Sequence, residues 1–457
     1  MKYSCSLLII LIFFLSVSKT AFPEGADSSL TLSKAVSRAL EEYPAIRASR
    51  ASHQEAEATS HQEAEATLGI NSATYLPLVK LNASATQFEK PMIVTPLHSF
   101  GLSQVPQFDQ TLYQGGLMVN YLLFDGGVRN ARVQQARAQL DSADTDLSVV
   151  IQDVIARVVS TYLAILTNQK ILEGHNQRIN ALKAELSRVQ QFYKAGRSPR
   201  VDILKVQASI ANAQADQVKN IEKLNLSNKE LSHLLNVSLE EIKYSKLVPV
   251  GLSNPFLDPQ ENLKKEGGQS SLSVKQARHK IEIADAGLGA ARGGRWPDLN
   301  LVGNYLYFGS SQSEKAVEWQ AGAQLSYVLF NGGAIRLEMA RAEAVKQNAL
   351  ERLRLAEIQT QQEIDRAVSA IEEAHARVES LETSVERLEE VARIEKLQLE
   401  TGSVTETDYL NAETDLLVAR NNLIETRYSE ISAYVELRHV TGHLNLRWLT
   451  ETVKDLP

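Results

Sequence analysis

The sequence predicts an α+β membrane protein in which four β-strands interrupt very long α-helices. Three observations indicate this class: long tracts rich in Ala, Leu, Glu, Gln and Arg, four segments of alternating apolar and polar residues, and a repetition of the whole pattern along the 457-residue chain. Aromatic residues make up only 6% of the chain and prolines number 12, which suits continuous helices. The formal net charge is -7, with acids and bases interspersed, so nucleic-acid binding is not expected.

The first 21 residues have the layout of a secretory signal peptide. Lys2 precedes the apolar run LLIILIFFL, and small residues follow this run up to Ala21. The only cysteine, Cys5, lies before the run and is removed with it, so we expect no disulfide in the mature chain. Because no later segment is an apolar run of about 18 residues, no transmembrane helix is expected. The exported chain is then periplasmic, secreted or an outer-membrane β-barrel.

Two sequence motifs recur at one spacing. YLLFDGG (Tyr121–Gly127) returns 206 residues later as YVLFNGG (Tyr327–Gly333). The same spacing aligns AGRSPRVDIL with TGSVTETDYL, pairing Gly196 with Gly402 and Asp202 with Asp408. A local stutter, SHQEAEAT written twice from Ser52 to Thr67, reads as a later insertion into this duplicated chain.

Each repeat is expected to contain a helix, a β-hairpin, a long helix and a returning helix. The predicted hairpins lie at 78–124 and 298–330. We predict a signal peptide at 1–21 and a first repeat at 29–236. A linker at 237–271 joins it to a second repeat at 272–442, and a C-terminal tail follows at 443–457.

The strands are predicted from strict alternation of apolar and polar residues. In VEWQAGAQLSYVL, alternate residues from Val317 to Leu329 are apolar or small, and polar residues occupy most positions between them. Such strands also occur in soluble β-sandwiches, but here the chain has only two hairpins and is otherwise helical. Transmembrane barrels need about eight strands at least, so several chains must contribute to one barrel.

A sharp turn follows each hairpin and begins a long helix. Asp125 and Asn331 are expected N-cap residues, and the two glycines after each allow unusual backbone dihedrals. These glycines are Gly126, Gly127, Gly332 and Gly333. The long helices are predicted at 129–194 and 336–400. About 65 residues give roughly 100 Å of helix, and apolar residues from Ile371 onward follow a heptad.

The returning helices are shorter than the long ones. A helix from Val201 to Asn236 would measure about 54 Å and could cover only half of its partner. Helices predicted before each hairpin, at Ala45–Ser72 and Ser273–Arg292, would cover the other half.

With these features together, the sequence resembles the TolC-like outer membrane efflux proteins. The resemblance covers nearly all of the mature chain. It rests on LTLSKAVSRALEEYPAIRASRA, on the strands that follow Pro77 and Pro297, on the two F-[DN]-G-G turns, and on AGRSPRVDIL and TGSVTETDYL, which we call the two glycine-aspartate segments. It implies a homotrimer with a twelve-stranded β-barrel in the outer membrane of a Gram-negative bacterium, continued by a long α-helical coiled-coil tunnel in the periplasm. Residues 237–271 and the C-terminal tail would form a belt around the tunnel.

The resemblance also implies an export duct for a tripartite efflux or type I secretion system. Its partners would be a periplasmic adaptor protein, an inner-membrane transporter and outer-membrane lipid. The exported substrate stays open, as does the choice between efflux and secretion. A trimeric coiled-coil adhesin or stalk is the alternative, although such proteins place their anchor strands once, at one end.

The resemblance implies that the two glycine-aspartate turns close the periplasmic end as a tip. Asp202 and Asp408 fall on its acidic positions, beside Gly196 and Gly402. Asn411 and Val404 stand where some members have an aspartate and an arginine, and Arg197 replaces a frequent apolar residue. The two aspartates also suit N-caps of the returning helices.

Enzymatic motifs are missing from the sequence. No H-E-x-x-H, G-x-S-x-G or cluster of Cys and His occurs, and His53 and His61 are copies within the stutter rather than a metal pair. We expect no catalytic residue, metal site or cofactor.

Overall fold

A computed structural model describes residues 29–44, 73, 75–94, 108–253, 268–311 and 315–456. The predicted signal peptide, the stutter at Ser52–Thr67 and the helix predicted at Ala45–Ser72 lie outside the described residues.

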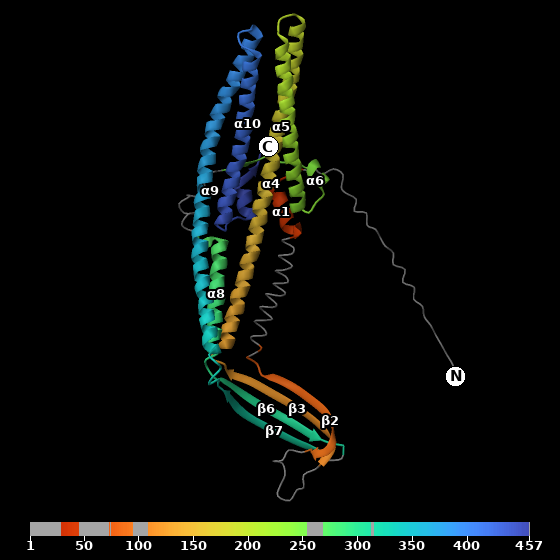
Figure 1. Ribbon diagram of the computed structural model, residues 1–457, viewed down its shortest axis with the longest axis vertical. Helices are drawn as coiled ribbons and strands as arrows, with labels where there is room; N and C mark the ends of the chain where they lie inside the picture. Colours follow the sequence, from red (N-terminus) through yellow and green to blue (C-terminus); the bar gives the residue numbers. More distant parts are fainter. Residues whose placement is uncertain are drawn as a thin grey trace, which may run out of the picture.

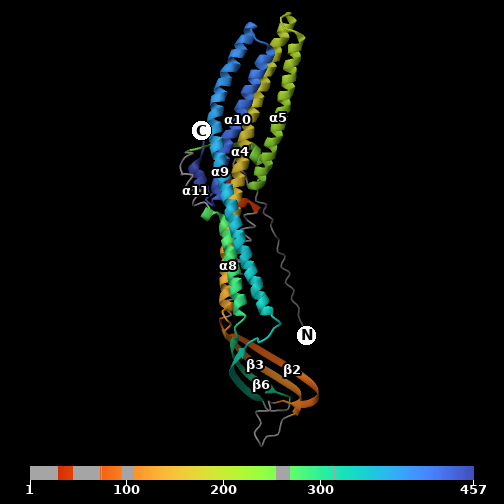
Figure 2. The ribbon, with the colours of Figure 1, turned by 60° about the vertical axis from the view of Figure 1, so that its left-hand side comes forward.

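The molecule is long and thin, with a β-sheet at one end and two helical hairpins at the other (Figure 1). Figure 2 shows the same division from a second side. The helices are α1 (Leu32–Glu42), α4 (Val128–Lys194), α5 (Arg200–Leu234), α6 (Leu239–Tyr244), α8 (Leu272–Gly293), α9 (Ala334–Thr401), α10 (Glu406–Val440) and α11 (Leu446–Thr452).

Two helices of nearly equal length run along the molecule. α4 has 67 residues and α9 has 68, so each is about 100 Å long. α5 and α10 have 35 residues each and pack along the far halves of α4 and α9. In the half nearer the sheet, α8 packs between α4 and α9. The short helix α8 therefore covers the half of α9 nearer the sheet, as the sequence predicts for the helix before the second hairpin.

One antiparallel sheet contains both hairpins. Its strands are β2 (Leu78–Ile93), β3 (Phe108–Phe124), β6 (Asp298–Gly309) and β7 (Ala316–Ser326), in the order β2-β3-β6-β7. β3 pairs with β6 and so joins the hairpins. β2 and β7 are the edges, and neither has a second neighbouring strand among the described residues.

The last strand is shorter than predicted. Alternation continues to Leu329, but β7 ends at Ser326. Ser326 pairs with Asp298, the first residue of β6, so the next residues have no partner strand in this chain. The prediction was wrong here because alternation reports which residues suit a strand, whereas pairing decides where the strand ends.

The largest hydrophobic core among the described residues lies midway along the molecule. Short strands pair beside it, and we call this region the belt. Strand β1 (Ser29–Leu30) pairs with β4 (Lys246–Leu247), and β5 (Val250–Leu252) pairs with β8 (Val453–Asp455). The linker and tail thus meet here, together with an N-terminal strand that the sequence did not predict.

Tyr162 ties the long helix α4 to this belt. Its side chain is fully buried. The hydroxyl accepts a hydrogen bond from Val248 N–H at 2.9 Å and lies 2.8 Å from the carbonyl oxygens of Leu30 and Val248. Burial raises the pKa of this hydroxyl far above its usual range, so it stays protonated and able to donate.

The residues around Tyr162 explain why one stretch of α4 is strongly apolar. By length and composition alone α4 contains a stretch apolar enough to cross a membrane, although the sequence was expected to contain none. More than half of that stretch is buried inside the protein. Ile155, Val158 and Ile165 belong to the belt core, which accounts for the apolar composition.

Candidate functional site

Both helical hairpins end in the same type of turn, at the end of the molecule far from the sheet. Gly196 and Gly402 adopt left-handed conformations, with φ of 72° and 77°. The next residue in each turn, Arg197 or Ser403, donates its N–H to the carbonyl five residues earlier at 2.8 Å. This is the Schellman arrangement that ends helices, and it requires a positive φ that glycine adopts without strain. The two turns are therefore geometric copies.

The predicted tip aspartates are the third residues of their helices rather than N-caps. The N-cap of α5 is Pro199 and that of α10 is Thr405, so the N-cap expectation was displaced by three residues. Asp202 accepts a hydrogen bond from the Ser198 hydroxyl at 2.8 Å. At this position a carboxylate still interacts favourably with the positive end of the helix dipole.

Asp408 is held more firmly than Asp202. It forms a capping box with Thr405, accepting the Thr405 N–H at 2.9 Å and the Thr405 hydroxyl at 2.6 Å, while its own N–H donates back to that hydroxyl at 3.3 Å. Hydrogen bonds from Thr405 lower the pKa of Asp408. Asn411 lies exposed one turn further along α10.

Next to the tip lies a charged cluster that sequence reasoning missed. Arg188 on α4 donates from Nη2 to Glu406 Oε2 at 3.0 Å and from Nε to Glu185 Oε1 at 2.8 Å. The Glu406 side chain is only 5% exposed. Burial, together with the neighbouring Glu185, raises the pKa of Glu406 to about 8. In the sequence, Glu185 and Arg188 read as an ordinary surface pair three residues apart, so no pattern pointed to this cluster.

Further side-chain contacts join the two helical hairpins. Lys205 Nζ on α5 donates to Thr407 Oγ1 on α10 at 2.7 Å. Deeper along the helices, Arg178 on α4 donates to Thr414 Oγ1 at 2.6 Å. The hairpins are thus joined near the tip by single polar contacts and by a small apolar cluster, in which Tyr409 and Leu410 of α10 lie with buried residues of α4 and α5.

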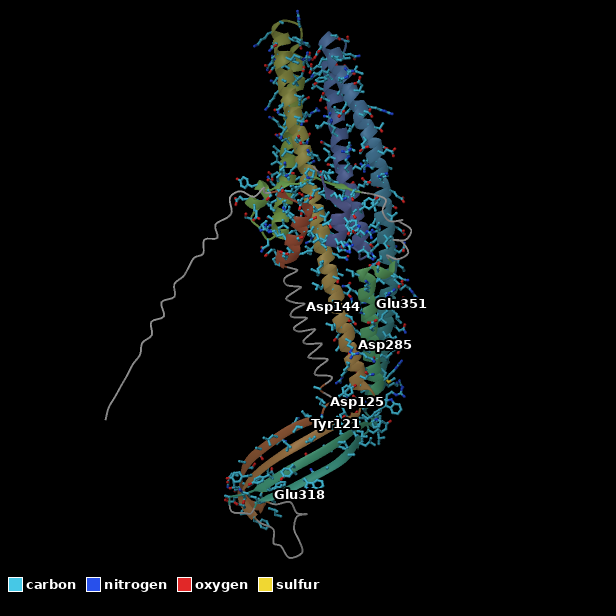
Figure 3. All side chains as sticks on the ribbon, turned by 180° about the vertical axis from the view of Figure 1, so that it is seen from behind. Tyr121, Asp125, Asp144, Asp285, Glu318 and Glu351 are labelled. Carbon is cyan, nitrogen blue, oxygen red and sulfur yellow. The ribbon has the colours of Figure 1, made fainter. Side chains whose placement is uncertain are left out.

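At the other end of α4, the first strand-to-helix turn is built around Asp125, labelled in Figure 3 where the sheet meets the helices. Asp125 accepts hydrogen bonds from Gly127 N–H at 3.1 Å, Arg129 N–H at 2.8 Å and Arg129 Nε at 3.0 Å. The Arg129 guanidinium lies over the Tyr75 ring, 4.5 Å from its centre.

The N-cap prediction for these turns was two residues early. The N-cap residues are Gly127 and Gly333, with φ of 87° and 86°. Each follows another left-handed glycine, Gly126 or Gly332, with φ of 65°. Two such residues delay the first helical residue past Asp125 and Asn331, although Asp125 still accepts a first-turn N–H.

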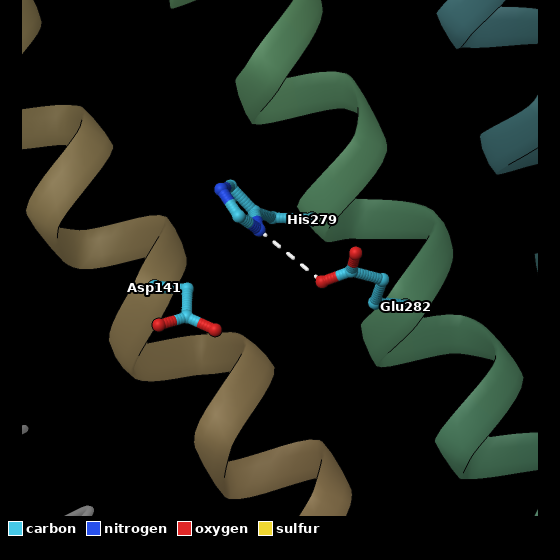
Figure 4. Close-up of side chains that lie close together, drawn as sticks. All are labelled: Asp141, His279 and Glu282. Carbon is cyan, nitrogen blue, oxygen red and sulfur yellow. Dashed lines mark hydrogen bonds and ion pairs between the residues drawn. The ribbon is translucent and has the colours of Figure 1, made fainter.

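Figure 4 shows Asp141 on α4 beside His279 and Glu282 on α8. Their nearest ligand-type atoms lie within 4.8 Å of one another. His279 Nδ1 and Glu282 Oε2 are 3.2 Å apart, and both carboxylates are exposed. Exposed acidic groups of this kind are common without a bound ion, and the hydrogen bond between His279 and Glu282 joins two residues of α8.

Comparison with known proteins agrees with this architecture. A family model described as outer membrane efflux protein matches residues 35–237 and 266–443. Protein CyaE of Bordetella pertussis is 27% identical over 418 residues, covering 87% of this chain and 81% of CyaE. The proteases secretion protein PrtF of Dickeya chrysanthemi is 24% identical over 371 residues, covering 76% of this chain and 78% of PrtF.

A solved structure has the same fold. The crystal structure of the outer membrane protein VceC of Vibrio cholerae superposes with a TM-score of 0.76 at 19% identity, covering 90% of this chain and 96% of VceC. The family match spans both repeats, including both hairpins and both tip turns. The chain is therefore an outer-membrane protein and belongs to the outer membrane efflux protein family.

Proposed function

We propose that three copies of this chain form an exit duct, with a twelve-stranded barrel in the outer membrane and an α-helical tunnel in the periplasm. The observation that carries the proposal is the four-stranded sheet with two open edges. Four strands are too few to close a barrel. If β7 of one copy pairs with β2 of the next, three copies give twelve strands and leave no edge.

The two faces of the sheet support its placement in lipid. Leu81, Leu117, Tyr305 and Trp319 are paired across the four strands in one continuous row. Their exposures are 79%, 43%, 56% and 74%. A row of large exposed apolar side chains suits contact with lipid tails. The residues next to them along each strand point to the opposite face, toward the lumen.

The helical half supports the role of a conduit rather than that of an adhesin. Each long helix leaves the sheet, reaches the tip and returns as a second helix to the belt, so both repeats run the length of a tunnel wall. Relatives named for secretion, and a family named for efflux, support export as the shared role. The duct receives its substrate from an inner-membrane transporter through a periplasmic adaptor that meets the tip.

The barrel is tested by two substitutions at adjacent positions on opposite faces of β7. Trp319→Arg places a charge on the lipid face and should destabilise the inserted barrel, by an amount that is about 2–4 kcal/mol at the bilayer midplane and falls toward the interfaces. Gln320→Arg, on the other face, should be tolerated. The oligomeric mass in detergent and the conductance in planar bilayers are measured for both variants and the parent. A parent protein that is a stable monomer without conductance would overturn the proposal, and so would equal behaviour of the two variants.

A further inference from the structure

The contact between Arg188 and Glu406 is one of several that join the two helical hairpins near the tip. Arg188 belongs to the α4–α5 hairpin and Glu406 is the first residue of α10, in the α9–α10 hairpin. Figure 1 shows the two hairpins side by side at this end. Any separation of the hairpins at the tip must break this contact.

The contact holds one positive group against two negative ones. Arg188 donates to Glu185 from both Nε and Nη2, which leaves a single hydrogen bond for Glu406. Among the described residues, the buried atom Glu406 Oε1 has no hydrogen-bond partner. A buried ionised carboxylate with an unpaired oxygen is costly, whereas a protonated one can donate its proton to a neighbouring carboxylate.

We propose that Glu185 and Glu406 share one proton beneath Arg188, and that this proton fastens the two helical hairpins together. With the proton present, the three side chains are neutral in sum and Glu406 can donate to Glu185 while accepting from Arg188. When the proton is lost, the cluster carries one buried negative charge and the hairpins separate more easily. This inference rests on the proposed function, because only a duct needs its tip to open.

The charged groups around Glu406 favour its protonated form. Asp202 on α5 adds negative potential at Glu406, and Glu400 on α9 lies near Arg188 and competes for its positive charge. The neighbouring phenol of Tyr409 on α10 is neutral, since burial raises its pKa to about 12. Arg188 is the cation that lowers the pKa of Glu406, and its charge is shared with Glu185, while the Lys205 ammonium lies on the neighbouring Thr407 hydroxyl.

The direction of the pH dependence follows from the raised pKa of Glu406, about 8 in the closed contact against 4.5 for an ordinary glutamate. A carboxyl group with a raised pKa binds its proton more tightly in the closed state. Closure is therefore fully supported below about pH 4.5 and is lost as the pH rises through about 8. In this window the ratio of closed to open hairpins falls by at most about tenfold per pH unit for each chain.

The first test is the resting conductance of the purified full-length protein in planar bilayers between pH 5.5 and 9. The parent should conduct weakly at low pH and increasingly at high pH. Glu406→Gln keeps a neutral group that can donate to Glu185 and accept from Arg188, so its conductance should stay low at every pH. The matched control is Glu389→Gln, which removes an exposed ion pair with Arg420 between α9 and α10. It should keep the parent's pH profile.

A second measurement follows the hairpins directly. Spin labels on cysteines at Arg197 and Ser403, which lie exposed in the two tip turns, report the distance between hairpins. The distance should increase from pH 6 to pH 9 in the parent and stay constant in Glu406→Gln. A constant distance in the parent, or an unchanged increase in Glu406→Gln, would overturn the shared proton. A protein that is a monomer and never conducts would instead overturn the proposed duct function. The spin-label distance would still show whether the proton shared by Glu185 and Glu406 holds the hairpins together.

Discussion

The two repeats have nearly the same elements but differ in how much of each is covered within one chain. α4 and α9 differ by one residue in length, yet among the described residues α4 buries more than twice as many side chains as α9. α9 instead exposes large apolar residues along its length, including Leu337, Val345, Leu355 and Ile358. The long helix of the first repeat is covered largely by its own chain, whereas that of the second presents an apolar surface that suits a neighbouring copy.

The strand-to-helix turns show the same difference at atomic scale. A Cβ added to Gly126 would lie 2.3 Å from the Gly293 carbonyl oxygen, whereas one added to Gly332 would meet nothing within 4 Å among the described residues. The first turn also holds the ion pair of Asp125 and Arg129, while the corresponding residues of the second turn are Asn331 and Ile335. Duplicated segments have thus diverged according to what lies against them.

The largest expected contrast between the repeats concerns this ion pair. Asp125→Ala leaves the buried Arg129 guanidinium without its carboxylate, and it removes an acceptor for the first turn of α4. The loss should be about 3–5 kcal/mol of unfolding free energy. Asn331→Ala, at the equivalent exposed position, should change it by less than about 0.5 kcal/mol. Denaturant unfolding followed by circular dichroism measures both, and similar losses would remove the distinction between the turns.

A smaller contrast is expected at the glycines. Gly126→Ala and Gly332→Ala both force a side chain into a left-handed conformation, at about 1–2 kcal/mol each. Gly126→Ala also clashes with Gly293, which should add about 1–3 kcal/mol. If another copy covers the second turn, Gly332→Ala should lower the fraction of trimer on native gels without unfolding the chain. An intact trimer would indicate that this turn stays open in the assembly.

The two tips should differ in how tightly they hold their aspartates. Asp408→Asn weakens a capping box and should destabilise the chain more than Asp202→Asn, which loses only the bond from Ser198. In a trimer, rings of these carboxylates would favour cations. Combining the two substitutions should lower the cation selectivity, measured by reversal potentials under a salt gradient. Unchanged selectivity would leave the aspartates with a helix-capping role alone.

The smallest effect is expected at Asn411. It is exposed in α10 and neutral, where some relatives have an aspartate. Asn411→Ala should therefore change the resting leak in planar bilayers little. A large increase in leak would show that this amide takes part in closing the second tip, and would make the two tips less alike than their turns.

Local periodicity predicted most of this fold. The heptads of the long helices and the alternation of the strands repeat over many residues, so the long helices and the four strands of the large sheet were found within a few residues of their ends. Features that depend on a distant partner could not be predicted. The end of β7 at Ser326 depends on where β6 begins, and the burial of Glu406 depends on the packing of α10 against Arg188. The N-caps were misplaced because Asp125 and Gly127 both suit that position, and only the backbone dihedrals distinguish them.

The open edges of the sheet also bear on how the protein can be produced. β2 offers 16 residues and β7 offers 11 with no second neighbour in the described chain, and an exposed apolar row crosses the sheet between them. Long unpaired edges of this kind join readily to other extended chains and begin aggregates. Pairing of β2 and β7 between copies to close the barrel therefore competes with aggregation from the moment the hairpins form. The rate at which new copies are synthesised decides which of the two outcomes dominates. Slow synthesis in step with delivery to the membrane should favour closed sheets, and rapid overproduction should favour insoluble protein.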